Sequence, residues 1–289
     1  MKRTNNVIKV FIAAMSLFSV VFLSSCSKEN LQNKSVQNGS VSNSTVANTP
    51  VAVWNFDSSF NESKQHLKGV AHKNATFTST SAARDGIAAF LSPKNGFVSY
   101  NNAGTALPNL TTGLSGDFWV FAYPKEGGAQ CIWCIPQVTD LNGDPSFWPD
   151  QHVLLDGYNS AQGDSGLIKV MFKLNKNVPY NEEWTQAGGI PKFYHRWSHI
   201  QYSYDGGTSQ YTLKVNGQTY FDHVVLYNSG DTTTRQPAGN LAPNPSPHGV
   251  LIGAFQNQWN AGVFGPPEVW MLPFKGKIDA LKIYDKSIF

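Results

Sequence analysis

Residues 196–217 read RWSHIQYSYDGGTSQYTLKVNG, and this pattern decides the fold. Apolar and polar side chains alternate along both halves, as in antiparallel strands with one buried face. Asn216-Gly217 is a dipeptide that tight two-residue hairpins favour. The alternation puts Ile200, Tyr202 and Tyr204, and then Tyr211, Leu213 and Val215, on the buried face, with His199, Gln201 and Ser203 on the opposite face.

The same signals continue from Val51 to the C-terminus. Short β-branched and aromatic runs are separated by Gly, Pro, Asn and Asp, and no long window has the apolar spacing of a helix. We therefore predict one all-β domain over 51–289, an antiparallel sandwich of two sheets. The predicted strands are 51–56, 86–91, 96–100, 116–123, 130–135, 152–156, 167–174, 193–204, 210–215, 218–224, 249–255 and 274–284.

An export signal precedes the domain. Residues 1–9 contain the basic residues, residues 10–23 are apolar or small, and residues 23–26 read LSSC. This order predicts a signal peptide over 1–25, because the apolar run is shorter than the roughly 20 residues of a spanning helix. Residues 23–26 resemble a bacterial lipobox, which implies cleavage before Cys26 and acylation of Cys26. The alternative is an ordinary secretory signal with a chance cysteine.

Acylation of Cys26 would hold the protein in the cell envelope by its lipid anchor alone, since two or more acyl chains anchor a protein stably. We expect the outer membrane, on its periplasmic or its outer surface. Residues 26–50 are rich in Ser, Asn and Thr and contain no aromatic residue. They are predicted to form a flexible linker with an end-to-end distance of roughly 25–30 Å.

Charge argues against a nucleic-acid partner. The chain has 22 Lys and Arg against 19 Asp and Glu, and three of the basic residues precede Cys26. The mature protein is therefore close to neutral, and it lacks the basic block that phosphate contacts require.

Cys131 and Cys134 remain once Cys26 is acylated. They lie in a predicted strand, where residues three apart point to opposite faces, so a disulfide would need a bulge or a turn. The sequence leaves three alternatives: two buried free thiols, a disulfide of the kind that exported proteins form, or a redox pair.

Ordered motifs along the domain resemble the LamG-like, concanavalin A-like jelly-roll family. The opening strand and its polar turn are 53–57 (VWNFD) and 61–63 (NES). The Trp-x-His strand with its two turns is 196–217. An Ile-Gly strand at 251–253 and the closing strand at 274–284 (FKGKIDALKIY) complete the set. The resemblance implies a jelly-roll fold and a structural calcium near Asp57 and Asp279.

Folds of this kind carry glycoside hydrolases, polysaccharide lyases and binding modules, so the fold does not fix the function. A hydrolase needs a pair of carboxylates across the scissile bond. The Glu-x-Asp-x-x-Glu string of the laminarinase-like enzymes is absent, and Glu182-Glu183 reads as a solvated loop. The Gln-Ile-His triplet of alginate lyases occurs only in reverse, at 199–201. We therefore predict no catalytic residue and no cofactor other than that calcium.

Aromatic residues in predicted loops carry the remaining chemical signal. An exposed indole can stack on the flat face of a sugar while neighbouring amides and carboxylates bind its hydroxyl groups. The residues predicted to bind a ligand are Trp148, Asp150, Trp184, Asn257, Trp259 and Trp270. The alternative is that these rings cap the open ends of the sandwich.

Strand 116–123 has a second aromatic stripe, Trp119, Phe121 and Tyr123, opposite its apolar face. This stripe is either covered by a loop or forms the floor of a concave site. The leading hypothesis is a cell-envelope lipoprotein with a non-catalytic carbohydrate-binding domain and a glycan or polysaccharide partner. The alternatives are a divergent polysaccharide-active enzyme and a protein-binding or adhesion module with outer-membrane protein partners.

Overall fold

The computed structural model describes residues 48–289 except 94, 102–106, 108–109, 124–125, 140–145, 158–162, 176–181, 229–234 and 245–247. The side chains of 182–187 and 228 also lie outside this description. The predicted signal peptide, Cys26 and nearly all of the predicted linker therefore fall outside the described residues. In the part that is described, no helix has the length and apolar character needed to cross a membrane.

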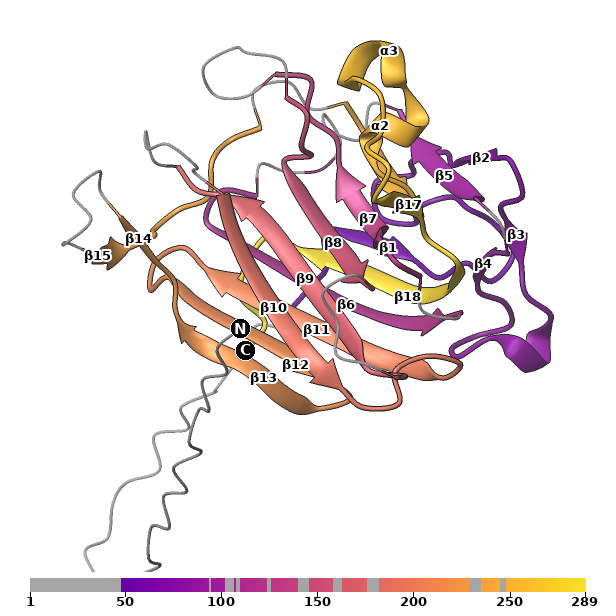
Figure 1. Ribbon diagram of the computed structural model, residues 1–289, viewed down its shortest axis with the longest axis horizontal. Helices are drawn as coiled ribbons and strands as arrows, with labels where there is room; N and C mark the ends of the chain where they lie inside the picture. Colours follow the sequence, from indigo (N-terminus) through magenta and orange to yellow (C-terminus); the bar gives the residue numbers. More distant parts are fainter. Residues whose placement is uncertain are drawn as a thin grey trace, which may run out of the picture. The chain divides into compact units, whose positions relative to one another are not determined.

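Two sheets form the fold (Figure 1). The first sheet runs in the order β13 (Gln218–Val224), β12 (Gln210–Val215), β11 (Trp197–Asp205), β6 (Gly113–Ala122), β18 (Gly276–Tyr284), β4 (Phe90–Ser92) and β3 (Thr76–Phe77), and β1 (Ala52–Trp54) pairs with β18. The second runs in the order β10 (Glu182–Ile190), β9 (Gly166–Lys173), β8 (Gln151–Asp156), β7 (Ala129–Ile135), β16 (Val250–Ile252), β5 (Phe97–Tyr100) and β2 (Val70–His72). These pairings are antiparallel, and β17 (Met271–Pro273) adds to β7 in parallel.

The remaining elements are short. They are the ribbon of β14 (Leu226–Asn228) and β15 (Arg235–Pro237), the 3₁₀ turn η1 (Thr80–Ala82), and the helices α2 (Gln256–Trp259) and α3 (Ala261–Phe264). Figure 1 shows α2, α3 and β17 gathered at one end of the second sheet.

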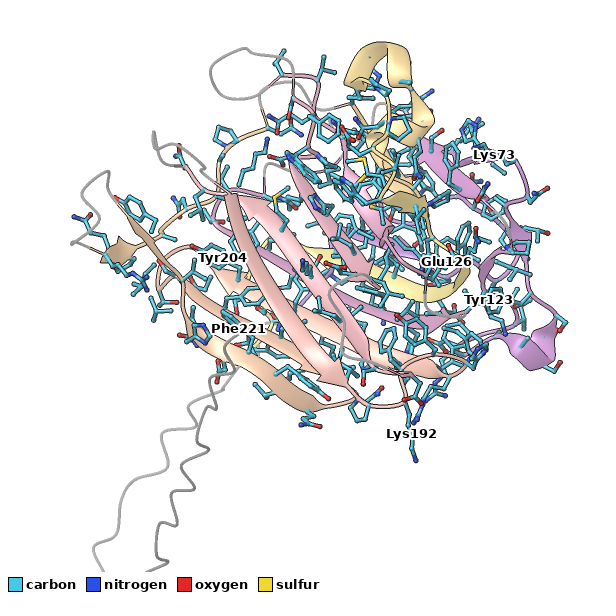
Figure 2. The ribbon with its side chains drawn as sticks, viewed as in Figure 1. Lys73, Tyr123, Glu126, Lys192, Tyr204 and Phe221 are labelled. Carbon is cyan, nitrogen blue, oxygen red and sulfur yellow. The ribbon has the colours of Figure 1, made fainter. Side chains whose placement is uncertain are left out.

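The main core lies between the two sheets, as the alternation predicts. Ile200, Tyr202 and Tyr204 of β11 are fully buried, while His199 and Gln201 on the other face are partly exposed. Figure 2 labels Tyr204, whose ring packs on Phe172 of β9 with centroids 4.7 Å apart. The prediction of an all-β antiparallel sandwich is therefore confirmed. Ser203 was predicted on the outer face but is buried, and it forms hydrogen bonds with Ser115 and with Ser287 near the C-terminus.

Every predicted strand overlaps an observed one, and the unpredicted strands lie mostly at edges. The prediction of a loop at Glu182-Glu183 was wrong, because these residues begin the edge strand β10. An edge strand needs only one hydrogen-bonded neighbour, so its sequence is freer than that of a central strand. The helices α2 and α3 are four residues each, which is too short to leave a helical period in the sequence.

A bulge in β7 resolves the geometry of the two cysteines. The register of β7 against β8 shifts between Cys131 and Trp133. As a result Cys131 and Cys134 both join the second apolar cluster, on the face away from the main core. Both thiols are free and fully buried. Burial, together with a hydrogen bond to Cys134, raises the pKa of the Cys131 thiol, which disfavours a reactive thiolate.

Candidate functional site

Three of the predicted ligand-binding tryptophans come together over the second sheet. Trp148 precedes β8, Trp259 ends α2, and Trp270 precedes β17. All three pack against the second apolar cluster and are partly buried. We call Trp148, Trp259 and Trp270 the tryptophan cluster.

The rings of the tryptophan cluster pack mainly on other rings. Trp148 stacks on His152 with an interplanar angle of 14° and contacts Trp270 at 5.4 Å between centroids. Trp259 lies 5.3 Å from the His248 ring and 6.0 Å from the Phe264 ring. These contacts occupy much of the flat surface that a sugar would need, and they favour the alternative of rings that cap the sandwich.

Asp150 and Asn257, expected beside these rings at the surface, are buried instead, with 4% and 1% exposure. The Nδ2 of Asn257 donates hydrogen bonds to the carbonyl oxygens of Phe264 and Gly265 and so holds the turn after α3. Burial raises the pKa of Asp150 to about 7, against the charge of Lys173, which lowers it. Neither side chain is therefore placed to bind a sugar hydroxyl group.

Trp184 was expected in a loop but lies in strand β10, opposite Met171 of β9 in the register. Its side chain is outside the described part of the chain, and its role in ligand binding remains a prediction. Residues 140–144 (DLNGD), which are rich in oxygen-bearing side chains, lie outside it as well.

Asp57 and Asp279, the predicted calcium ligands, both hold the segment 84–88 through its backbone. Asp279 is fully buried and accepts hydrogen bonds from the backbone N–H groups of Arg84, Asp85 and Ala280. Asp57 accepts the N–H groups of Ile87 and Ala88.

The two carboxylates do not form a shared ligand set. A cavity of about 170 Å³ is lined by Asn55, Asp57, Asp85, Gly86 and Ala280, but not by Asp279. Among the described residues no group of three or more His, Cys, Asp or Glu is arranged to hold a metal ion. The oxygens of Asp279 are used by backbone donors, so this geometry does not fit a calcium ion shared with Asp57.

The outer face of the first sheet carries a different aromatic surface. Across β18, β6 and β11 the register aligns three rows: Lys277–Phe121–Trp197, Asp279–Trp119–His199 and Lys282–Asp117–Gln201. The β6 and β11 members are all partly exposed, and so are both lysines. The stripe of Trp119, Phe121 and Tyr123 is therefore partly exposed, and Figure 2 labels Tyr123 beyond the end of β6.

Cations lie on the rings of the first two rows. Trp119 stacks on His199 at 4.5 Å and 11°, and the Arg84 guanidinium carbon lies 4.0 Å from the Trp119 ring centre. Phe121 meets Trp197 edge to face at 5.7 Å, with the Lys277 ammonium 4.2 Å from the Phe121 ring centre. We call Arg84, Trp119, Phe121, Trp197, His199 and Lys277 the aromatic–cation face.

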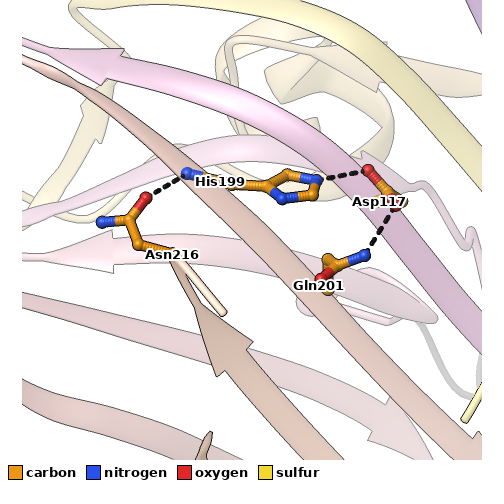
Figure 3. Close-up of polar contacts among 4 residues, drawn as sticks. All are labelled: Asp117, His199, Gln201 and Asn216. Atoms are coloured by element: carbon orange, nitrogen blue, oxygen red, sulfur yellow. Dashed lines mark hydrogen bonds and ion pairs between the residues drawn. The ribbon is translucent and has the colours of Figure 1, made fainter. Parts of the chain in front are cut away.

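Polar groups continue the aromatic–cation face in the third row (Figure 3). His199 Nε2 lies 2.7 Å from Asp117 Oδ1, and Gln201 Nε2 donates to Asp117 Oδ2 at 2.9 Å. Burial alone would raise the pKa of Asp117, but these hydrogen bonds and the charges of His199 and Lys282 lower it overall. Asn216 Oδ1 accepts the backbone N–H of His199 and ties the hairpin turn to this strand.

One end of the aromatic–cation face is open along the sheet. In the described register β12 pairs with β11 only from Ile200 onward, so Trp197 has no paired residue on that side. A partly exposed indole can stack on a flat apolar ligand face, while neighbouring carboxylate, amide and imidazole groups can bind hydroxyl groups. The double stripe of strand 116–123 was the signal for this surface, although none of its residues was predicted as a ligand contact.

No family model matches the chain, and no curated protein matches it. Solved structures do share its fold. Domain 4 of AbnA, a GH43 extracellular arabinanase from Geobacillus stearothermophilus, in complex with arabinotriose, matches with a TM-score of 0.50 at 14% identity, over 83% of this chain and 94% of that one. The binding domain of botulinum neurotoxin DC in complex with SialylT matches with a TM-score of 0.51 at 10% identity.

The neurotoxin match covers 84% of this chain, which spans about half (49%) of the neurotoxin chain. Identities this low establish the fold alone. The described domain is a concanavalin A-like jelly-roll sandwich, as the ordered sequence motifs predict.

Proposed function

We propose that this chain is a cell-envelope lipoprotein whose jelly-roll domain binds glycans, without cleaving them, at the aromatic–cation face. The observation that carries the proposal is the group of partly exposed rings Trp119, Phe121 and Trp197 on two neighbouring strands, next to the Asp117–His199–Gln201 network. Contiguous exposed rings are unusual on a soluble protein and mark interaction sites. Rings beside hydroxyl-binding groups match the mixed surface of a sugar.

Two further points support this proposal. The arabinanase domain that shares the fold was solved with arabinotriose. The sequence also lacks the carboxylate string of the jelly-roll hydrolases, and the Asp117 carboxylate is engaged by His199 and Gln201 rather than poised across from a second acid.

The test is binding of the full mature chain, purified in detergent, to a panel of immobilised polysaccharides. The variants Trp197→Ala and Phe121→Ala should each weaken binding about tenfold or more, since stacking on a sugar is lost. The variants Trp148→Ala and Trp259→Ala test the tryptophan cluster, and Tyr227→Ala, in the β14–β15 ribbon, is the control.

The outcomes separate the hypotheses. Loss of binding in the tryptophan-cluster variants, with the aromatic–cation variants unchanged, would move the site to the sequence-predicted residues. Release of soluble products from a polysaccharide would overturn the non-catalytic assignment. Failure to bind any glycan, with capture of an outer-membrane protein instead, would favour the adhesion alternative.

A further inference from the structure

The cations of the aromatic–cation face have no carboxylate partner in the part of the chain that the structure describes. The ion pairs found there join Lys169 to Asp156, His199 to Asp117 and Lys275 to Glu126. Arg84 and Lys277 lie on aromatic rings instead. A ring attracts a cation by its quadrupole but does not neutralise it, so both positive charges stay available to an anion.

Both cations are also held in place. The backbone N–H of Arg84 is bound by the buried Asp279 carboxylate at 2.9 Å, and the Arg84 guanidinium packs on Trp119. Lys277 projects from the central strand β18 one row away, with its ammonium over Phe121 and 5.9 Å from the Trp197 ring centre. Partial burial lowers the pKa of Lys277, so an arriving anion would compensate a desolvated charge.

The carboxylate of the same face is already engaged by its neighbours. Asp117 is bound by His199 and Gln201 and lies opposite Lys282 in the third row. The two cations therefore lie on the first two rows, and the hydrogen-bonding groups lie in the third. An anionic ligand gains attraction there that a neutral ligand does not.

We infer that the glycan bound at the aromatic–cation face is acidic, with a sugar carboxylate held by Arg84 and Lys277 and the sugar ring resting on Phe121 and Trp197. This inference rests on the proposed glycan-binding function. A planar guanidinium can bind a carboxylate through two parallel hydrogen bonds, which favours a uronic acid over a neutral sugar. The hydroxyl groups of the same or the next residue would meet Gln201 and Asp117.

The experiment measures binding of the full mature chain to polygalacturonate, to carboxyl-reduced polygalacturonate, and to dextran with and without sulfation. We expect tighter binding to polygalacturonate than to its reduced form, weakened between 50 and 300 mM NaCl as screening increases. Lys277→Gln and Arg84→Gln should each reduce polygalacturonate binding roughly tenfold, the effect of one lost charge-assisted contact. Binding to the reduced polymer, which has no carboxylate to lose, should fall by less.

Lys68→Gln, an exposed lysine outside this face, is the matched control for charge. Arg84→Lys keeps the charge and should restore part of the affinity. Equal binding to the acidic and reduced polymers would overturn the inference and leave glycan binding intact. Equal binding to dextran sulfate would also overturn it, because it would show attraction to any polyanion. Binding to no polymer would refute the proposed function itself.

Discussion

At the residue scale, the titrations of Asp150 and His152 in one buried site change the stability of the domain in opposite directions as the pH rises. Burial raises the pKa of Asp150 to about 7 from 3.8, and burial lowers the pKa of His152 to about 3 from 6.5, with Lys173 lowering both. Between pH 3.8 and 7 the folded state holds a proton on Asp150 that the unfolded state releases, so this stabilisation falls as pH rises. Between pH 3 and 6.5 the unfolded state protonates His152 and the folded state does not, so stability rises with pH.

The two effects nearly cancel in the native protein, so this pair together should change its stability little from pH 5 to 8. In Asp150→Asn the histidine effect is unopposed, so the free energy of unfolding should rise by about 2 kcal/mol over that range. In His152→Phe, which keeps the ring against Trp148, it should fall by about 2–3 kcal/mol. Urea denaturation at pH 5 and pH 8 measures both slopes. If the free energy of unfolding changed with pH in the same direction in both variants, the pKa shifts assigned to Asp150 and His152 would be contradicted.

The sequence drew attention to its aromatic residues but could not supply their neighbours. It predicted that Trp148 and Trp270 would be loop tryptophans, but their contact depends on how a loop and the segment before β17 fold onto β8. Arg84 had no sequence signal at all. Its place on Trp119 follows from a hydrogen bond to Asp279, which is 195 residues away in the chain.

At the scale of elements, the β12–β13 hairpin is the part most fully predictable from sequence. Asn216 and Gly217 have φ values of 52° and 79°, as the tight turn requires. Gly217→Ala should destabilise the domain by about 1 kcal/mol, because a side chain is strained at positive φ. Asn216→Ala should cost about 1–2 kcal/mol, since the hydrogen bond to His199 is lost as well.

The matched control for this hairpin is Gly127→Ala, at a glycine with no heavy atom within 4 Å of an added Cβ and no positive φ. Thermal and urea unfolding should show that this variant is as stable as the native protein. A Gly217 variant as stable as the native protein would show that the turn does not fix the register of β12 and β13.

The β7 bulge leads to a chemical expectation for the cysteines. Because both thiols are buried and the pKa of Cys131 is raised, iodoacetamide should label neither in the native protein. In denaturant, without reductant, both should be labelled. Intact-mass spectrometry distinguishes the alternatives: labelling in denaturant only after reduction would reveal a disulfide, and labelling in the native state would indicate a reactive pair.

Most of the strands that the sequence did not predict lie at the edges of the sheets. Central strands such as β6 and β11 alternate because one face is buried and the other is not. Strand β10 at the sheet edge and the four-residue helices carry no comparable period. The parallel addition of β17 to β7 brings residues 271–273 onto 129–131, a long-range pairing that no local pattern encodes.

At the scale of the whole molecule, the order of the motifs was enough to predict the fold, because each motif serves the same sandwich. Glu62 in the opening turn is buried and accepts the backbone N–H groups of Val53 and Lys64. Asp279 in the closing strand holds the segment before β4. The proposed ligand surface was less predictable, because a jelly roll has two outer faces and only the packing shows which one leaves aromatic rings partly exposed.

The proposed lipid anchor would set where the aromatic–cation face operates. Leu23-Ser24-Ser25-Cys26 at the end of the apolar run predicts acylation of Cys26, and residues 26–50 predict a tether long enough to hold the domain clear of the bilayer. Expressed with its own signal, the native chain should incorporate radiolabelled palmitate and sediment with membranes. Cys26→Ser should lose the label and the membrane association, while Cys131→Ala, a cysteine inside the domain, should keep both. A native chain that is cleaved but unlabelled and recovered in the soluble fraction would establish an ordinary secretory signal, and the domain would then act as a released protein.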